Sequence, residues 1–511
     1  MSFASRGLQY DRYGLLWLGE IEVLRTTTAE PSASGIHWGV EKDLTLYQSY
    51  LRSFASLPVS LAIPNNVDSK YTGVIVVNAT LSFYGPMTTS APTPFIVPLT
   101  NAPASGLWPP LGLDSNNSQI YFFRLPEACR GRRLRRLSLR TLASSHGCEE
   151  FYYTNPPNAN ATALDACNGG SYREIQVLVN GSLAAAVVPT IIVYSGGVNP
   201  LLWRPLAGPQ SFDILPHEFE LSPFLGLFAE SSAANTSVQI TLLVLVDGNL
   251  KVNSWMLDSH ILIYFTDETM DDSSVILTGS VGHFTESITK SAEVLPRDGG
   301  LTFFVTSIHS HSFNSTLLLA NNETIRYYSS FYLETESSNS YSDSGWEVCA
   351  IRHRSVIDLV ITAGNGSILE ETHLSSWFNL FLADWSAVDD STFFLKSLVK
   401  MDTAVSSSTH GATNGVVESS WKCGIDSWAI YNKSLEGSTI FQRDACANAY
   451  YIEEAPRKCR RKVDAFNGTI TLDESFGTCG GPIGVHMPNP VSSSPQSQLI
   501  LLVHRRPEKM V

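Results

Sequence analysis

Charged residues are scarce in this 511-residue chain, at 16% of positions. That scarcity argues against disorder, coiled coils and long solvated helices. The sequence has no run of 18 apolar residues, so we expect no transmembrane helix and no membrane insertion. The net charge of -14 argues against nucleic acid and anionic membranes as partners, because both require a basic surface.

No Cys-x-x-Cys pair occurs among the eight cysteines, which leaves zinc ribbons and thioredoxin-like sites without support. An even number of cysteines fits an oxidising compartment. Cys148 with Cys167, and Cys446 with Cys459, would each make a plausible local bridge, although eight cysteines allow 105 pairings. The opening residues also lack the apolar segment of a signal peptide, so we expect that the N-terminal end of the protein is missing from this chain.

Asn-x-Ser/Thr sequons are abundant, at about twice the number that chance predicts. Such sites are modified only in proteins that meet the glycosylation machinery. We therefore expect an all-β glycoprotein of the secretory pathway, either secreted or held in a vacuole or cell wall. The sequons lie at Asn78, Asn116, Asn160, Asn180, Asn235, Asn314, Asn322, Asn365, Asn432 and Asn467.

Short β-branched segments bounded by Gly-Gly, Asn-Gly and Asp-Gly turns dominate the chain, at residues 73–77, 175–179, 238–246 and 260–265 among others. Helical periodicity is limited to a turn or two near residues 44–54 and 374–382. This pattern predicts an all-β assembly of sandwiches or jelly rolls.

Two breaks in the pattern predict three domains. A Pro/Thr/Ser-rich stretch at residues 85–94 and the acidic segment 271–274 divide the chain into 1–88, 89–268 and 275–511. The third part is serine-rich, and we expect short strands there. Peptide recognition, structural support and contact within a homodimer all stay open as roles for it.

Two stretches carry specific motifs. The first is Asp11-Arg12-Tyr13, and the second includes Glu-Glu-Phe-Tyr-Tyr-Thr-Asn at 149–155 and Asn-Pro-Leu-Leu-Trp-Arg-Pro at 199–205. Over about residues 5 to 268 the chain resembles the peptide:N-glycosidase A family, amidases of plants and fungi that release N-glycans. More distantly, Asp-Arg-Tyr, Ser-Ser-His-Gly at 144–147 and a Cys-flanked acidic loop occur in an order similar to that of bacterial peptide:N-glycosidase F. The resemblance implies two side-by-side jelly rolls with a site at their junction.

The resemblance implies hydrolysis of the amide bond between the first N-acetylglucosamine and the Asn side chain, in N-glycosylated peptides or denatured glycoproteins. This reaction requires a water activated by a carboxylate, a proton for the departing glycosylamine and donors for an oxyanion, but no cofactor. The peptide product carries Asp. A catalytically silent glycan-binding protein on the same scaffold is the alternative, and it would keep an aromatic surface without aligned carboxylates.

By this resemblance, Asp11 is the central acid/base residue; alternatively it pairs with Arg12 in a strand turn. Glu150, with Glu149 beside it, is the candidate second carboxylate, because an acidic pair lets one group stay ionised while the other holds a proton. Only one of two adjacent strand residues can face a cleft. We choose Glu150, because it precedes the aromatic run as the glutamate of the bacterial enzyme precedes its Trp. Aligning instead on Cys167 and Arg173 would leave no glutamate at that place.

Arg12, Arg173, Trp203 and Arg204 are candidate substrate contacts. Aromatic faces stack on the apolar side of pyranoses, and guanidinium groups donate hydrogen bonds in a fixed fork. Each of these residues could equally be structural. His146 reads as a structural hydrogen-bonding residue. His309 and His311 share one strand face, yet no third ligand is evident, so we expect no metal site.

Overall fold

The computed structural model is all-β, as the sequence predicts. In the part of the chain that it describes, the longest helix is α3 (Leu225–Ala233), with nine residues. None of the described helices has the length and apolar content that crossing a membrane requires. The structure describes residues 1–31, 35–83, 93–100, 113, 116–129, 132–194, 211–246, 254–269, 278–297, 300–318, 323–342, 345–388, 392–411, 415–432, 438–452, 455–466 and 469–477.

Two three-stranded antiparallel sheets form the N-terminal sheet pair, with strand orders β4-β1-β6 and β3-β2-β5. In the core between them, the Trp38 ring stacks on Phe3 with centroids 5.0 Å apart. A two-residue turn joins β2 to β3, and Gly19 in this turn has a φ of +61°, which favours glycine. The strands are β1 (Ser2–Ser5), β2 (Tyr13–Leu18), β3 (Ile21–Thr27), β4 (Ile36–Gly39), β5 (Val59–Ala62) and β6 (Val76–Asn78).

Two four-stranded antiparallel sheets form the middle sheet pair, with strand orders β12-β9-β14-β7 and β11-β10-β13-β8. The strands are β7 (Phe95–Pro98), β8 (Ser118–Phe123), β9 (Arg132–Ser145), β10 (Arg173–Val179), β11 (Ser182–Val187), β12 (His217–Glu220), β13 (Val238–Val246) and β14 (Trp255–Thr269).

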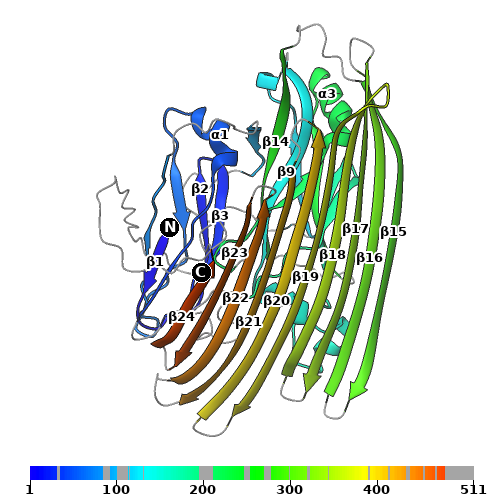
Figure 1. The fold of residues 1–511 in the computed structure, drawn as a ribbon. Helices are drawn as coiled ribbons and strands as arrows, with labels where there is room; N and C mark the ends of the chain where they lie inside the picture. Colours follow the sequence, from blue (N-terminus) through cyan, green and yellow to red (C-terminus); the bar gives the residue numbers. More distant parts are fainter. Residues whose placement is uncertain are drawn as a thin grey trace.

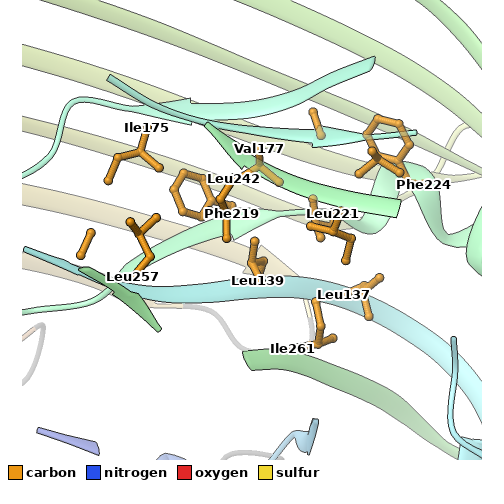
Figure 2. Packing of buried hydrophobic residues seen from close by; sticks show 14 of the residues in the cluster. Leu137, Leu139, Ile175, Val177, Phe219, Leu221, Phe224, Leu242, Leu257 and Ile261 are labelled. Carbon is orange, nitrogen blue, oxygen red and sulfur yellow. The ribbon is translucent and has the colours of Figure 1, made fainter. Parts of the chain in front are cut away.

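The core of the middle sheet pair follows from period-two patterning. Along β13, every second residue from Val238 to Val246 is buried, as expected for a strand with one face on a core. Figure 2 shows Leu139 and Ile261 of one sheet packing towards Val177 and Leu242 of the other. Each fully buried side chain of this size contributes roughly 1.5–3 kcal/mol.

A tight hairpin connects β10 to β11. Asn180 and Gly181 both have positive φ, 47° and 83°, as a two-residue primed turn requires. The Asn-Gly dipeptide therefore indicates the turn correctly from the sequence.

Ten antiparallel strands in chain order, β15 to β24, form the long sheet. Their lengths run from nine residues in β24 to 21 in β19, so the prediction of short strands in this region is wrong. The strands are β15 (Thr278–Arg297), β16 (Gly300–Leu318), β17 (Thr324–Ser342), β18 (Gly345–Ala363), β19 (Ile368–Val388), β20 (Thr392–Gly411), β21 (Gly415–Asn432), β22 (Ser438–Ile452), β23 (Ala455–Phe466) and β24 (Thr469–Gly477).

The long sheet lies along the middle sheet pair (Figure 1), where the Phe313 ring stacks on Phe224 with centroids 4.7 Å apart. The two predicted helical segments have different outcomes. Residues 44–54 contain η1 (Thr45–Tyr47) and α1 (Gln48–Arg52), so the first prediction is confirmed. Residues 374–382 lie instead within β19 and pair with strands on both sides, because long-range pairing overrides a weak local pattern.

The predicted disulfide between Cys148 and Cys167 is present, with the two Cα atoms 5.5 Å apart. It closes a loop directly beside the Glu149-Glu150 pair. The side chains of the second predicted pair, Cys446 and Cys459, lie outside the residues whose side chains the structure describes.

The N-terminal and middle sheet pairs meet along an interface that we call the junction. Ile21 and Val23 of β3 pack there with Ile96 of β7 and Leu262 of β14. The Tyr13 ring, at the start of β2, lies 4.4 Å from the ring of His146, just after β9, which brings the two sequence motifs together.

Candidate active site

Asp11 lies in the extended segment just before β2. Backbone hydrogen bonds hold this segment in place: the Arg12 amide donates to the Thr28 hydroxyl and the Thr28 amide to the Arg12 carbonyl, both at 2.7 Å. The Arg12 guanidinium donates to the backbone carbonyl of Asp11, at 3.0 Å, and to the Gln9 side chain. Asp11 therefore has a defined position at the edge of the N-terminal sheet pair.

Glu150 lies just after β9, at the end of a short 3₁₀ turn, η3 (Gly147–Glu149). Gly147 opens the turn with a φ of +59°, and the Glu150 amide donates to its carbonyl at 3.0 Å. The two glutamates thus belong to a turn, and our assumption of a strand at this point is wrong. The turn still directs their carboxylates to different surroundings.

The structure brings Asp11 and Glu150 together from the two sheet pairs. Burial and the negative charge of Asp11 raise the pKa of Glu150 to about 7. Burial and the charges of Glu150 and Asp11 also raise the pKa of Tyr194, which places this phenol beside both carboxylates. A pair of carboxylates in this state can hold one shared proton near neutral pH.

Glu149 has a different environment. Its carboxylate is 3% exposed and receives hydrogen bonds from Arg173 at 2.5 and 2.7 Å and from the Trp255 indole at 3.0 Å. Arg173 is fully buried; its remaining terminal nitrogen donates to three backbone carbonyls, and its guanidinium lies over the Tyr152 ring. In this structure neither side chain is available to a substrate, and their catalytic and substrate-binding roles stay predictions.

Aromatic rings surround the carboxylate pair. The His146 ring lies 4.4 Å from Tyr13 and 6.1 Å from Tyr194, measured between centroids, and Phe151 meets Tyr194 edge-on. His146 Nε2 is 2.8 Å from the Ser144 hydroxyl, which agrees with the structural hydrogen-bonding role predicted from the sequence. Burial and the nearby charge of Arg25 lower the pKa of His146 to about 3, so the ring is neutral.

A second aromatic cluster is exposed beside Asp11. The Tyr10 side chain is 49% exposed, and its hydroxyl is 2.9 Å from that of Tyr71. Arg12 lies over the Tyr10 ring at 5.5 Å and Lys70 over the Tyr71 ring at 5.1 Å. Ring faces and hydroxyls of this kind suit the apolar face and hydroxyl groups of a sugar.

The remaining predicted residues lie elsewhere. Trp203 and Arg204 are outside the described residues. His309 contacts Glu174 between the middle sheet pair and the long sheet, with 2.9 Å between Nδ1 and the carboxylate. Across the described ranges, no group of three His, Cys, Asp or Glu side chains could hold a metal ion.

Tyr194, Ser144 and Arg25 were not singled out from the sequence. Tyr194 ends the run Ile191-Ile192-Val193, which reads as an ordinary core segment, and Arg25 reads as a strand residue. Only their places in the fold distinguish them from other residues of the same type.

Comparison with known proteins decides the family. Residues 1–280 match the family described as Peptide N-acetyl-beta-D-glucosaminyl asparaginase amidase A. The chain belongs to this amidase A family. It is 32% identical over 284 residues to a relative from Prunus dulcis, "Peptide-N4-(N-acetyl-beta-glucosaminyl)asparagine amidase A". That alignment covers 52% of this chain and 47% of the relative, so the match spans about half of each. No solved structure matches the chain.

The amidase A region contains both motifs, the whole N-terminal sheet pair and the whole middle sheet pair. It ends at the start of β15, so almost all of the long sheet lies beyond it. The carboxylate pair is thus built entirely from the part of the chain that defines the family.

Proposed function

We propose that this chain hydrolyses the amide bond between N-acetylglucosamine and the Asn side chain in N-glycopeptides or denatured glycoproteins. The observation that carries the proposal is the burial of Glu150 beside Asp11 across the junction; burial and the charge of Asp11 together raise the pKa of Glu150 to about 7. Family membership supports the same reaction class. Together with this activity we infer a jelly-roll fold, a glycopeptide substrate and a secretory compartment.

The roles follow from the two carboxylates. Asp11 acts as the base and takes a proton from water as that water attacks the carbonyl carbon of the Asn side chain. Glu150, which keeps its proton up to about pH 7, donates it to the nitrogen as the carbon–nitrogen bond breaks. The products are an Asp-containing peptide and a glycan that ends in a glycosylamine.

The exposed cluster of Tyr10, Tyr71, Arg12 and Lys70 is our candidate for the surface that receives the sugar. Tyr10 precedes Asp11 in the chain, and half of Tyr10 is exposed. Stacking of a pyranose on Tyr10 would bring the linkage of its neighbouring sugar close to the carboxylates.

Strand order supports a jelly roll for the middle sheet pair. A jelly roll is a double sheet of eight strands formed by two Greek keys. The orders β12-β9-β14-β7 and β11-β10-β13-β8 interleave early and late strands in both sheets, as this topology requires. The six-stranded N-terminal sheet pair is consistent with a partner sandwich beside it.

A secretory location is supported by two features. The disulfide between Cys148 and Cys167 requires an oxidising compartment. Several sequon asparagines are also exposed and accessible to glycosylation: Asn78, Asn116, Asn180, Asn235, Asn314 and Asn365.

The test is conversion of Asn to Asp in ¹⁸O water. The purified protein is incubated with an N-glycopeptide, and mass spectrometry of the peptide should detect Asp that carries one ¹⁸O atom. Asp11→Asn and Glu150→Gln should abolish the signal, while Glu20→Gln, at an exposed turn, serves as the matched control. If the wild-type chain binds the glycopeptide but leaves its Asn unchanged, the silent glycan-binding alternative replaces the proposal.

A further inference from the structure

Arg25, on β3, crosses the junction beneath the carboxylate pair. Its side chain is fully buried and donates two hydrogen bonds to Glu22, at 2.6 and 2.9 Å. Its Nη1 reaches the middle sheet pair, where it donates to the Ser144 hydroxyl at 3.0 Å and to the Met256 carbonyl at 2.6 Å. A buried charge is costly unless it is paired and hydrogen-bonded, so these contacts determine how the two sheet pairs fit together.

The direction of the hydrogen bond from Arg25 is fixed. A guanidinium group only donates, so the Ser144 oxygen accepts from Arg25. The Ser144 hydroxyl keeps its own proton and a second lone pair, so it can pair with His146 Nε2, 2.8 Å away, in either tautomer of the neutral ring. We call Arg25, Ser144 and His146 the Arg25 network.

The network ends between the two segments that carry the carboxylates. The His146 ring lies 4.4 Å from Tyr13, two residues after Asp11. The backbone carbonyl of His146 accepts from the Glu149 amide at 3.0 Å, within the turn that leads to Glu150. A displacement of His146 would therefore change the position of either carboxylate relative to the other.

The geometry points to a positioning role: we propose that Arg25, acting through Ser144 and His146, holds Asp11 and Glu150 at the separation at which their carboxylates interact. Arg25 contacts no substrate in this arrangement, so it is not a catalytic residue. A test by glycopeptide hydrolysis rests on the proposed function, whereas a test by titration of Glu150 does not.

Other charged and titratable groups face Arg25 and must be kept unchanged in any test. Burial and the negative charge of Glu22 raise the pKa of Asp258, on β14. Burial raises the pKa values of Tyr13 and Tyr194, and the positive charge of Arg25 partly offsets this rise. A variant that removes the charge of Arg25 would shift all of these groups together. Charge-conserving variants therefore isolate the effect of geometry.

Two such variants break the network at different links. Ser144→Ala removes the hydroxyl between Arg25 and His146 and leaves both partners in place. Arg25→Lys keeps the positive charge but cannot donate to Glu22 through a two-pronged guanidinium fork. Thr141→Val is the matched control, because it removes another buried hydroxyl of β9, which is hydrogen-bonded to Ser259 at 2.9 Å, and changes no charge.

Two measurements are made on each full-length variant. The first is the titration of Glu150, followed by carboxyl infrared or ¹³C NMR signals that disappear in Glu150→Gln. The second is the pH profile of glycopeptide hydrolysis, with kcat and KM determined separately. In Ser144→Ala and Arg25→Lys we expect the pKa of Glu150 to fall, because Asp11 is no longer held beside it. We expect kcat to fall by about 10- to 100-fold with little change in KM.

The outcomes separate this proposal from the proposed function. If both variants lose thermal stability to the same extent as Thr141→Val while the titration of Glu150 and the pH profile stay unchanged, Arg25 is merely structural and the positioning role is refuted. If the wild-type protein hydrolyses no glycopeptide but Ser144→Ala shifts the Glu150 titration, the positioning role stands and the proposed function fails. If Arg25→Lys does not fold, Ser144→Ala decides alone.

Discussion

Glu149 and Glu150 are adjacent in one turn, yet their surroundings are opposite. Glu149 faces the interior of the middle sheet pair, where Arg173 and Trp255 satisfy its carboxylate. Glu150 faces the junction, where burial and the like charge of Asp11 raise its pKa. Removing one partner of a buried ion pair is strongly destabilising, whereas a carboxylate with a raised pKa in a cleft is a candidate for a functional group. The turn thus directs one carboxylate to a cation and the other to the junction.

The largest expected effect is on turnover and concerns Glu150 and its neighbour Asp11. Asp11→Asn and Glu150→Gln should each reduce kcat/KM by about 10²- to 10⁴-fold, because each removes a positioned acid or base. Circular dichroism and thermal melting should show a folded protein in both cases. A variant that keeps wild-type turnover would remove its residue from the mechanism.

For Glu149, which is buried and paired with Arg173, substitution should reduce the stability of the fold. Glu149→Gln leaves the buried Arg173 charge uncompensated, so the free energy of unfolding should fall by about 3–5 kcal/mol. Urea denaturation measures this change, and Glu20→Gln at the exposed turn should change it by less than about 0.5 kcal/mol. Turnover per folded Glu149→Gln molecule should be near that of wild type. Loss of turnover with unchanged stability would reverse the roles of the two glutamates.

The raised pKa of Glu150 predicts how stability depends on pH. Its pKa is about 7 in the folded protein against 4.5 ordinarily, so the folded state binds more protons between these values. The contribution of Glu150 to stability is thus fully present below pH 4.5 and is lost as the pH rises through 7. Glu150→Gln should therefore become more stable than wild type at pH 8, by about 1–3 kcal/mol, and not at pH 4. Chemical denaturation at the two pH values tests this, and an equal difference at both would contradict the raised pKa.

The smallest effect concerns substrate affinity. Tyr10→Ala should raise KM for an N-glycopeptide by about 2- to 10-fold and leave kcat nearly unchanged, since it removes a stacking surface and no reacting group. Phe122→Ala is the control, because Phe122 is 72% exposed on β8 and has no contact with the site. An equal rise in KM for both variants would indicate a nonspecific effect.

Local patterns predicted the fold class well. The Asn180-Gly181 turn, the alternation along β13 and the bridge between Cys148 and Cys167 each depend on neighbouring residues or a short loop. The lengths of the strands in the long sheet could not be predicted in the same way. Their pairing partners are whole strands, as for residues 374–382 in β19, where cross-strand contacts outweigh local preference.

Site residues that belong to a sequence motif could be predicted, whereas those that depend on packing between distant segments could not. The Asp11 and Glu150 motifs led to two residues that the structure brings together, whereas nothing in the sequence indicates that Arg173 is the partner of Glu149. That pairing depends on the disulfide-closed loop and on Trp255 of a strand far along the chain. Arg25 was missed for the same reason, because its role depends on contacts across the junction.

Because Asp11 and Glu150 lie in different sheet pairs, the carboxylate pair can form only after both sheet pairs have been synthesised. A ribosome releases Asp11 first, and the N-terminal sheet pair cannot complete a site by itself. Glu150 gains its neighbour only after β14, whose Met256 carbonyl receives Arg25, has been made and packed. Five of the ten sequons of this chain, from Asn78 to Asn235, precede β14, so half of them are synthesised before the carboxylate pair can form.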